Sequence, residues 1–157
     1  MKLFIKRLSI VLVIYTVIIS VAILNPNQKE FNKTFNNSFV TTDFKTMSKN
    51  STIEINAKLY KRFSLKHFNS DKILDGYITI DNKKYALFGY DLGTSTNNLL
   101  FGDVKEKSTD ITPIYILYMF DNLNSIYLSG FDNKQHIAAP ANTIDDFEIL
   151  HRKINRK

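Results

Sequence analysis

The clearest pattern along the chain is an alternation of apolar and polar positions over residues 52–59. Ile53, Ile55, Ala57 and Leu59 alternate with polar side chains, which is typical of a strand with one buried face. Similar short apolar runs, bounded by Asn, Asp, Gly or Pro, predict further strands. These are expected over 77–81, 84–90, 98–101, 114–120, 125–131 and 136–139.

Three details of these runs predict how the strands are arranged. Asn82 and Lys83 separate two runs by the length of a tight hairpin turn. Gly89 interrupts another run, where a bulge or a close backbone approach is the usual reason. Residues 114–120 are apolar on both faces, so we expect a central strand that is covered on its outer side.

The end of the chain has the pattern of an amphipathic helix over residues 143–155. Thr143 suits the N-cap position, and apolar side chains recur at Ile144, Phe147, Leu150 and Ile154. This helix is expected to cover the sheet. The predicted fold class is mainly β (α+β), a small antiparallel sheet of about six or seven strands with one C-terminal helix packed on it. A closed β-barrel with the helix as a lid is the alternative.

Residues 1–24 form a separate hydrophobic segment. An uncharged run over 8–24 follows Lys2, Lys6 and Arg7. As a helix it spans about 26 Å, against a hydrocarbon thickness of roughly 30 Å. We expect a signal-anchor at the cell membrane, with the N-terminus in the cytoplasm and the domain outside. The alternatives are a signal peptide cleaved near Ala22, which would give a secreted protein, or a buried core helix.

Residues 25–50 are rich in Asn, Ser, Thr and Lys and are expected to be a polar, membrane-proximal linker. Phe31, Phe35 and Phe39 are spaced by four residues, so a weak interfacial helix is one alternative. The other is that these rings cover the edge of the core. The β-rich domain, outside the cytoplasm, is then expected over 51–157.

Composition and charge narrow the possible functions. The 157 residues are 44% hydrophobic, which is enough for one packed domain. The formal charge is +6, but the first 24 residues supply three of these charges, and the rest has 18 Lys and Arg against 15 Asp and Glu. Without a dense basic face we expect no nucleic-acid partner. The absence of cysteine excludes disulfides, thiolate catalysis and Cys-based metal sites.

The stretch Asp91-Leu92-Gly93-Thr94 follows an expected strand and resembles the Asp-x-Gly-Thr turn of the actin-like and heat-shock chaperone ATPases. The resemblance covers about seven residues. It implies backbone amides and a hydroxyl around a terminal phosphate. That family, however, encloses its nucleotide in a two-lobed chain several times larger, and this loop is expected outside the membrane, where ATP is scarce. We therefore expect a polar loop and no nucleotide.

No residue spacing indicates a metal, a cofactor or a catalytic group. The histidines His67, His136 and His151 are far apart in the sequence, unlike the ligands of a typical zinc site. The stretch 121–124 lacks the central Gly and closing Glu of a calcium loop. A small hydrolase that uses His67 or His136 with a neighbouring Asp stays an alternative.

Six tyrosines on expected strands are the candidate binding residues, because an aromatic face with a polar rim suits recognition. They are Tyr77, Tyr85, Tyr90, Tyr115, Tyr118 and Tyr127. We predict a bacterial binding or interaction module at the cell envelope, without catalytic activity. Its partner would be another envelope protein or a cell-wall component. The alternatives are the hydrolase and a protective, immunity-type envelope protein.

Overall fold

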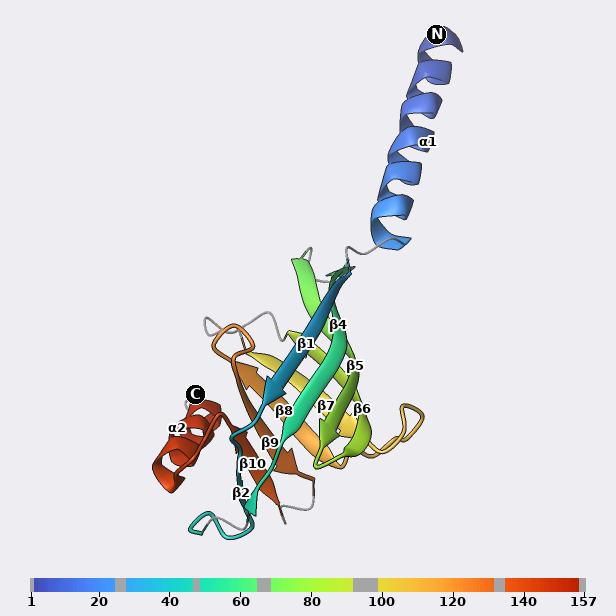
Figure 1. Cartoon of the computed structure of the whole chain (residues 1–157). Coiled ribbons are helices and arrows are strands. Elements are labelled where there is room, and N and C mark those ends of the chain that lie inside the picture. Colours follow the sequence, from blue (N-terminus) through green and yellow to red (C-terminus); the bar gives the residue numbers. More distant parts are fainter. Residues whose placement is uncertain are drawn as a thin grey trace.

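The computed structural model describes residues 2–24, 28–46, 49–64, 69–91, 99–131 and 135–155. These residues form two helices and ten strands (Figure 1). The helices are α1 (Lys2–Leu24) and α2 (Ile144–Asn155). The strands are β1 (Lys29–Phe35), β2 (Phe39–Thr41), β3 (Lys49–Asn50), β4 (Ile53–Ser64), β5 (Asn69–Ile80), β6 (Lys83–Asp91), β7 (Leu100–Lys105), β8 (Tyr115–Phe120), β9 (Ser125–Gly130) and β10 (His136–Ala139).

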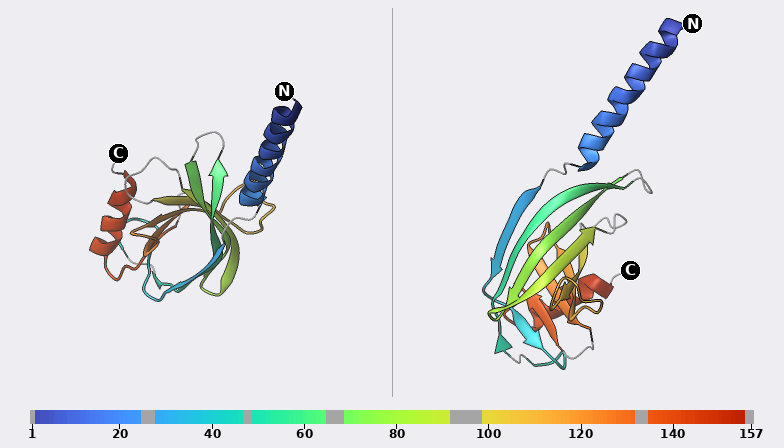
Figure 2. Two further views of the ribbon diagram at one scale, coloured as in Figure 1. Left: turned by 90° about the horizontal axis from the view of Figure 1, so that it is seen from above. Right: turned by 90° about the vertical axis from the view of Figure 1, so that its right-hand side faces the viewer.

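All these strands belong to one antiparallel sheet, in the order β1-β4-β5-β6-β7-β8-β9-β10-β2-β3. From β4 to β10 each strand pairs with the next along the chain. Asp81 and Asn82 join β5 to β6, and their positive φ angles of 49° and 65° are those that a two-residue hairpin turn needs. The predicted hairpin is confirmed, with its turn one residue earlier than expected. The sheet curls strongly, as Figure 2 shows from above.

A bend at residues 36–38 connects the two ends of the sheet. β1 pairs with β4, whereas β2 pairs with β10 on one edge and with β3 on the other. At the bend, the Ser38 hydroxyl donates a hydrogen bond to the Ser51 carbonyl. Only three residue pairs join β2 to β10, and within the described residues β1 has one strand partner. The sheet is therefore a curled half-barrel, between the open sheet and the closed barrel that the sequence allows.

The concave side of the sheet holds the main core. It is built from alternate residues of every strand from β4 to β10, as the apolar alternation predicts. Gly89 faces this core, where an added Cβ would lie 2.4 Å from Leu100 Cδ2. The register of β5 with β6 is continuous past Gly89. A close approach, and not a bulge, therefore explains this glycine.

A second core lies on the convex side, under α2. Phe147 and Leu150 of the helix pack there with Phe39, Phe120 and Tyr127 of the sheet. β8 pairs on both edges, with β7 and β9, and its two faces serve the two cores. The predictions of a two-faced central strand and of a covering C-terminal helix are both confirmed.

The predicted count of six or seven strands is too low. β1, β2 and β3 lie within 25–50, where a polar linker was expected. Side chains four residues apart share a face of a strand as well as a side of a helix, and Phe31 and Phe35 both contact the main core. Phe39 lies on the opposite face because the bend intervenes. Pairing with β4 and β10 overrides the weak strand propensity of this Asn-rich segment.

β4 and β5 are also longer than expected. Each has 12 residues and they pair along their full length, from Ile53↔Ile80 to Ser64↔Asn69. The expected strands, 52–59 and 77–81, cover only the end of this pair at which Ile53 is opposite Ile80. Asp75 and Gly76 separate the buried Ile73 and Leu74 from the alternating run that begins at Tyr77, so a pattern search does not find this continuation of β5.

The N-terminal segment forms α1, as its apolar run predicts for a helix. The large apolar side chains described between residues 8 and 17 are exposed, with Val11, Leu12 and Tyr15 at 63%, 64% and 66%. Over the described residues, neither helix meets the length and apolarity that mark a membrane span.

Candidate functional site

Four aromatic side chains form a continuous row across the convex face of the sheet. Tyr90 on β6, Phe101 on β7, Tyr118 on β8 and Tyr127 on β9 are directly opposed across neighbouring strands. Successive ring centroids are 5.7, 5.3 and 6.3 Å apart, and the rings are inclined at 70°, 76° and 63°. Edge-to-face packing of this kind is favourable for aromatic pairs. We call these four residues the aromatic ladder.

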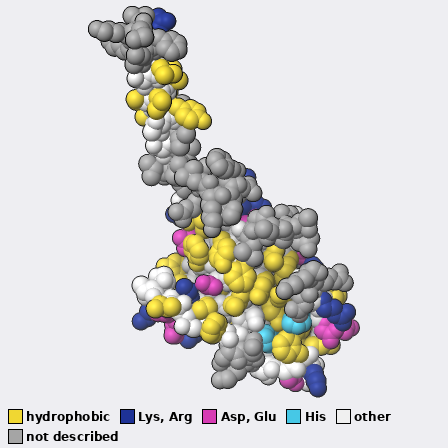
Figure 3. All heavy atoms as spheres, turned by 180° about the vertical axis from the view of Figure 1, so that it is seen from behind, with side chains coloured by type: hydrophobic (Ala, Val, Ile, Leu, Met, Phe, Trp, Pro, Cys, Tyr) yellow, Lys and Arg dark blue, Asp and Glu magenta, His cyan; other side chains and the backbone are white. Residues whose placement is uncertain are grey.

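Helix α2 covers only one end of the aromatic ladder. Tyr127 is 1% exposed, and its ring lies 5.6 Å from that of Phe147. The other three ladder residues are half-buried. Phe88, whose ring lies 6.4 Å from that of Tyr90, is 45% exposed. Figure 3 shows hydrophobic side chains gathered in a band across the body, with histidines beside it. The ladder thus has a buried end under α2 and an open end at β6.

Two carboxylates border the open end. Asp75 on β5 and Asp103 on β7 stand directly opposite Phe88, one on each side. These three residues, with Tyr77 and Lys105 among others, line a shallow cavity of about 260 Å³. The Lys105 Nζ lies 3.9 Å from the Asp103 carboxylate, near the outer limit of an ion pair. The open end is therefore apolar with an acidic border.

Two histidines that are far apart in the sequence meet at the buried end of the ladder. The Tyr127 hydroxyl lies 3.1 Å from Nδ1 of His136 on β10 and 3.0 Å from Nδ1 of His151 on α2. A phenol has one proton, so it can donate to only one imidazole and must accept from the other. When both imidazoles are neutral, they are therefore opposite tautomers. This bridge ties α2 to the sheet.

The Phe44 ring packs against both imidazoles in tilted geometry, with ring-centre distances of 4.2 Å to His136 and 5.2 Å to His151. A turn built on Asp43 positions it. The Asp43 carboxylate accepts hydrogen bonds from the amides of Thr46 and Lys45, both at 2.9 Å. These bonds hold the pKa of Asp43 well below its usual range. The turn is thus fixed by a charged carboxylate at neutral pH.

The chemistry of this cluster favours neutral groups. Burial lowers the pKa of His151, against a smaller opposing effect of Glu148, and burial raises the pKa of Tyr127. The Ser129 hydroxyl lies 3.4 Å from His136 Nδ1, farther than the Tyr127 hydroxyl. The hydrogen bonds described for His136 are to hydroxyls, not to the Asp that the hydrolase alternative needs. The arrangement is better suited to holding α2 on the sheet than to activating a nucleophile.

A second shallow cavity, of about 310 Å³, lies beside this cluster. It is lined by Phe44, Phe147, Glu148, His151 and Arg152. The Arg152 guanidinium is already paired with the Glu148 carboxylate, four residues earlier on the helix. The two charges at this cavity therefore largely neutralise one another.

The six predicted tyrosines divide into three groups. Tyr90, Tyr118 and Tyr127 come together in the aromatic ladder. Tyr85 and Tyr115 lie in the main core on the concave side of the sheet, with their rings edge to face at 6.3 Å, and so are not part of the ladder. Tyr77 is 49% exposed on β5, with Lys84 Nζ 3.8 Å from its ring centre.

The sequence patterns did not point to Phe88, Phe101 or Phe44, nor to the meeting of His136 and His151 at the Tyr127 hydroxyl. Alternation along a strand predicts part of this surface, because Phe88 and Tyr90 are two residues apart and share a face of β6. Their cross-strand neighbours follow only from the register. His67 and residues 92–94 of the ATPase-like stretch lie outside the described residues, and Asp91 ends β6.

Among the described residues, no group of three or more His, Asp or Glu side chains is placed to hold a metal ion. No known family model, no curated protein and no solved structure matches this chain.

Proposed function

We propose that this protein is a binding module without catalytic activity, and that the open end of the aromatic ladder is its binding surface. One observation carries the proposal. The row of rings that α2 buries at Tyr127 continues through the half-buried Tyr118, Phe101 and Tyr90 to the exposed Phe88. An exposed apolar patch with a polar rim is typical of a surface that a partner covers.

The orientation of the rings favours a protein partner over a cell-wall glycan. A sugar ring stacks best on a flat aromatic face. Here Tyr90, Phe101 and Tyr118 are inclined to one another by 70° and 76°, so their surface is ridged. Ridges of rings suit the interlocking side chains of a protein. An immunity-type role would be the special case in which that protein is a toxin.

We further propose that the protein works at the cell envelope, with the run 8–24 held in the membrane and the domain outside. The apolar side chains of this run and the preceding Lys6 and Arg7 support the proposal. Release after cleavage near Ala22 is the alternative. Cell fractionation with intact-mass measurement tests it: the full mass in the membrane fraction is expected, and a soluble product lacking residues 1–22 would contradict the anchor.

Site-specific photocrosslinking in cells tests the binding surface. A benzoylphenylalanine is placed at position 101, in the ladder, or at position 131, which holds an exposed Phe beyond the end of β9 and outside the cavity at the open end. We expect a discrete crosslinked product from position 101 and not from position 131. Equal products from both positions, or none from position 101 in a folded protein, would contradict the ladder as the binding surface.

A further inference from the structure

We propose that the partner covers the aromatic ladder with an amphipathic α-helix that lies beside α2 and carries a basic side chain toward Asp103. This inference rests on the proposed function and adds the kind of partner. It follows from the way the chain covers the buried end of the same ladder.

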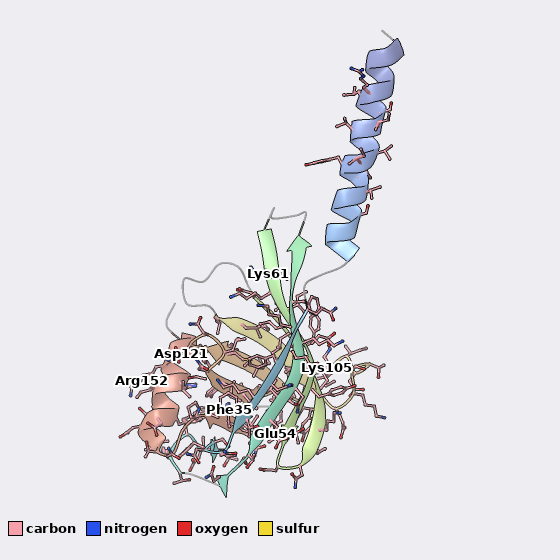
Figure 4. The ribbon with its side chains drawn as sticks, turned by 45° about the horizontal axis from the view of Figure 1, so that its top comes forward. Phe35, Glu54, Lys61, Lys105, Asp121 and Arg152 are labelled. Atoms are coloured by element: carbon pink, nitrogen blue, oxygen red, sulfur yellow. The ribbon has the colours of Figure 1, made fainter. Side chains whose placement is uncertain are left out.

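The contact between α2 and the sheet shows what the ladder accepts. Phe147 and Leu150 of α2 pack over Tyr127. At the edge of this contact, Lys153 Nζ lies 2.7 Å from the carboxylate of Asp121 and 6.0 Å from the ring centre of Phe120. Figure 4 shows Asp121 beside α2. The interface thus combines an apolar helix stripe on the ladder with a lysine that reaches an aspartate next to a phenylalanine.

The open end has the same features, an aromatic row and a carboxylate beside a phenylalanine, but neither described helix covers it. Phe101 and Tyr118 continue the ladder, and Phe88 stands between the carboxylates of Asp75 and Asp103. Lys105 only partly compensates Asp103, at 3.9 Å. A basic side chain of the partner would therefore find a carboxylate beside an exposed ring, as Lys153 does at the buried end.

Among the described elements, the spacing is sufficient for a second helix beside α2. Packed helices lie roughly 8–10 Å apart, and neighbouring strands roughly 4.8 Å apart. A helix beside α2 is therefore displaced by about two strands. Since α2 contacts β9 and β10, the second helix would lie over β7 and β8. Those strands carry Phe101 and Tyr118, the middle of the ladder.

A peptide with the sequence of residues 142–157 is a suitable probe, because it has the required apolar stripe and Lys153. The fluorescein-labelled peptide is titrated with the full-length protein, and binding is followed by fluorescence anisotropy. We expect saturable binding that Phe101→Ser weakens at least tenfold. Asp103→Asn should weaken it about threefold and reduce its salt dependence. The matched control Phe131→Ser changes an exposed aromatic beyond the end of β9, outside the ladder and the cavity at its open end, and should leave binding unchanged.

Changes in the peptide provide a second set of tests. Lys153→Glu in the peptide should weaken binding to the wild-type protein but not to Asp103→Asn. Leu150→Pro should abolish binding, because proline breaks the helix. Circular dichroism checks that each protein variant is folded. Should Phe101→Ser not fold, Asp103→Asn and the peptide variants decide the question.

Three outcomes would overturn the inference. The first is no binding at peptide concentrations up to about 1 mM. The second is binding that ignores Phe101→Ser and Asp103→Asn, which would mean displacement of α2 or contact elsewhere. The third is a ladder-dependent dimer of the protein that excludes the peptide. A crosslink at position 101 without peptide binding rejects the helix alone, whereas loss of both rejects the proposed function as well.

Discussion

Tyr127 is the residue at which the sheet, α2 and the Asp43 turn meet. Its hydroxyl is shared by two imidazole nitrogens, and its ring is the buried end of the aromatic ladder. Tyr127→Phe keeps the ring and removes both hydrogen bonds inside a buried cluster. We expect a loss of about 1–2 kcal/mol in the free energy of unfolding, measured by urea denaturation. The control Tyr118→Phe, at the next, half-buried ladder position, should cost less than about 0.5 kcal/mol.

His151 makes the stability of the fold depend on pH. Burial lowers its pKa in the folded state below the ordinary value of 6.5. The unfolded chain therefore binds the proton more readily, and stability that is present above pH 6.5 falls as the pH drops below it. We expect the urea midpoint to decrease from about pH 7.5 to pH 5.5, and to decrease less in His151→Gln. Equal decreases in both proteins would show that His151 does not contribute.

Among the elements, helix α2 depends for its stability on the capping hydrogen bonds of its first turn. Thr143 Oγ1 accepts a hydrogen bond from the Asp146 amide at 3.2 Å, and the Asp146 carboxylate accepts from the amides of Asn142 and Thr143. Thr143→Ala should destabilise the protein by about 1 kcal/mol, since it removes the N-cap. Urea denaturation measures this loss. The exposed Thr109→Ala should change stability by less than about 0.5 kcal/mol, and an equal effect would contradict the capping role.

Local sequence patterns predict some of these elements and not others. The hairpin at Asp81–Asn82, the two-faced strand β8 and helix α2 were predictable, because each has a local signature in turn residues or periodicity. β1 and β2 were not. Their strand character comes from pairing with β4 and β10, which no local pattern contains. Three of the four ladder residues were among the predicted tyrosines, but their alignment was not predictable. Residue type is local, whereas opposition across strands is set by the register.

At the scale of the whole molecule, the curled sheet leaves one edge of β1 without a strand partner among the described residues. Exposed edges promote association, and inward-pointing charges protect against it. Lys33 is such a charge. It lies on the core-facing side of β1, its ammonium bonds to the Asn124 side chain across the open side of the half-barrel, and it lies 5.3 Å from the ring centre of Phe35.

Replacement of Lys33 therefore tests how the half-barrel avoids pairing with itself. Lys33→Val removes the inward charge and gives β1 an apolar, strand-forming side chain, so we expect concentration-dependent dimers or larger species by light scattering. Lys58→Val is the matched control, because it makes the same change on β4, which is paired on both edges. It should stay in the same state as the wild-type protein. If Lys58→Val associates as strongly as Lys33→Val, loss of charge alone explains the effect, and the edge of β1 needs no protection.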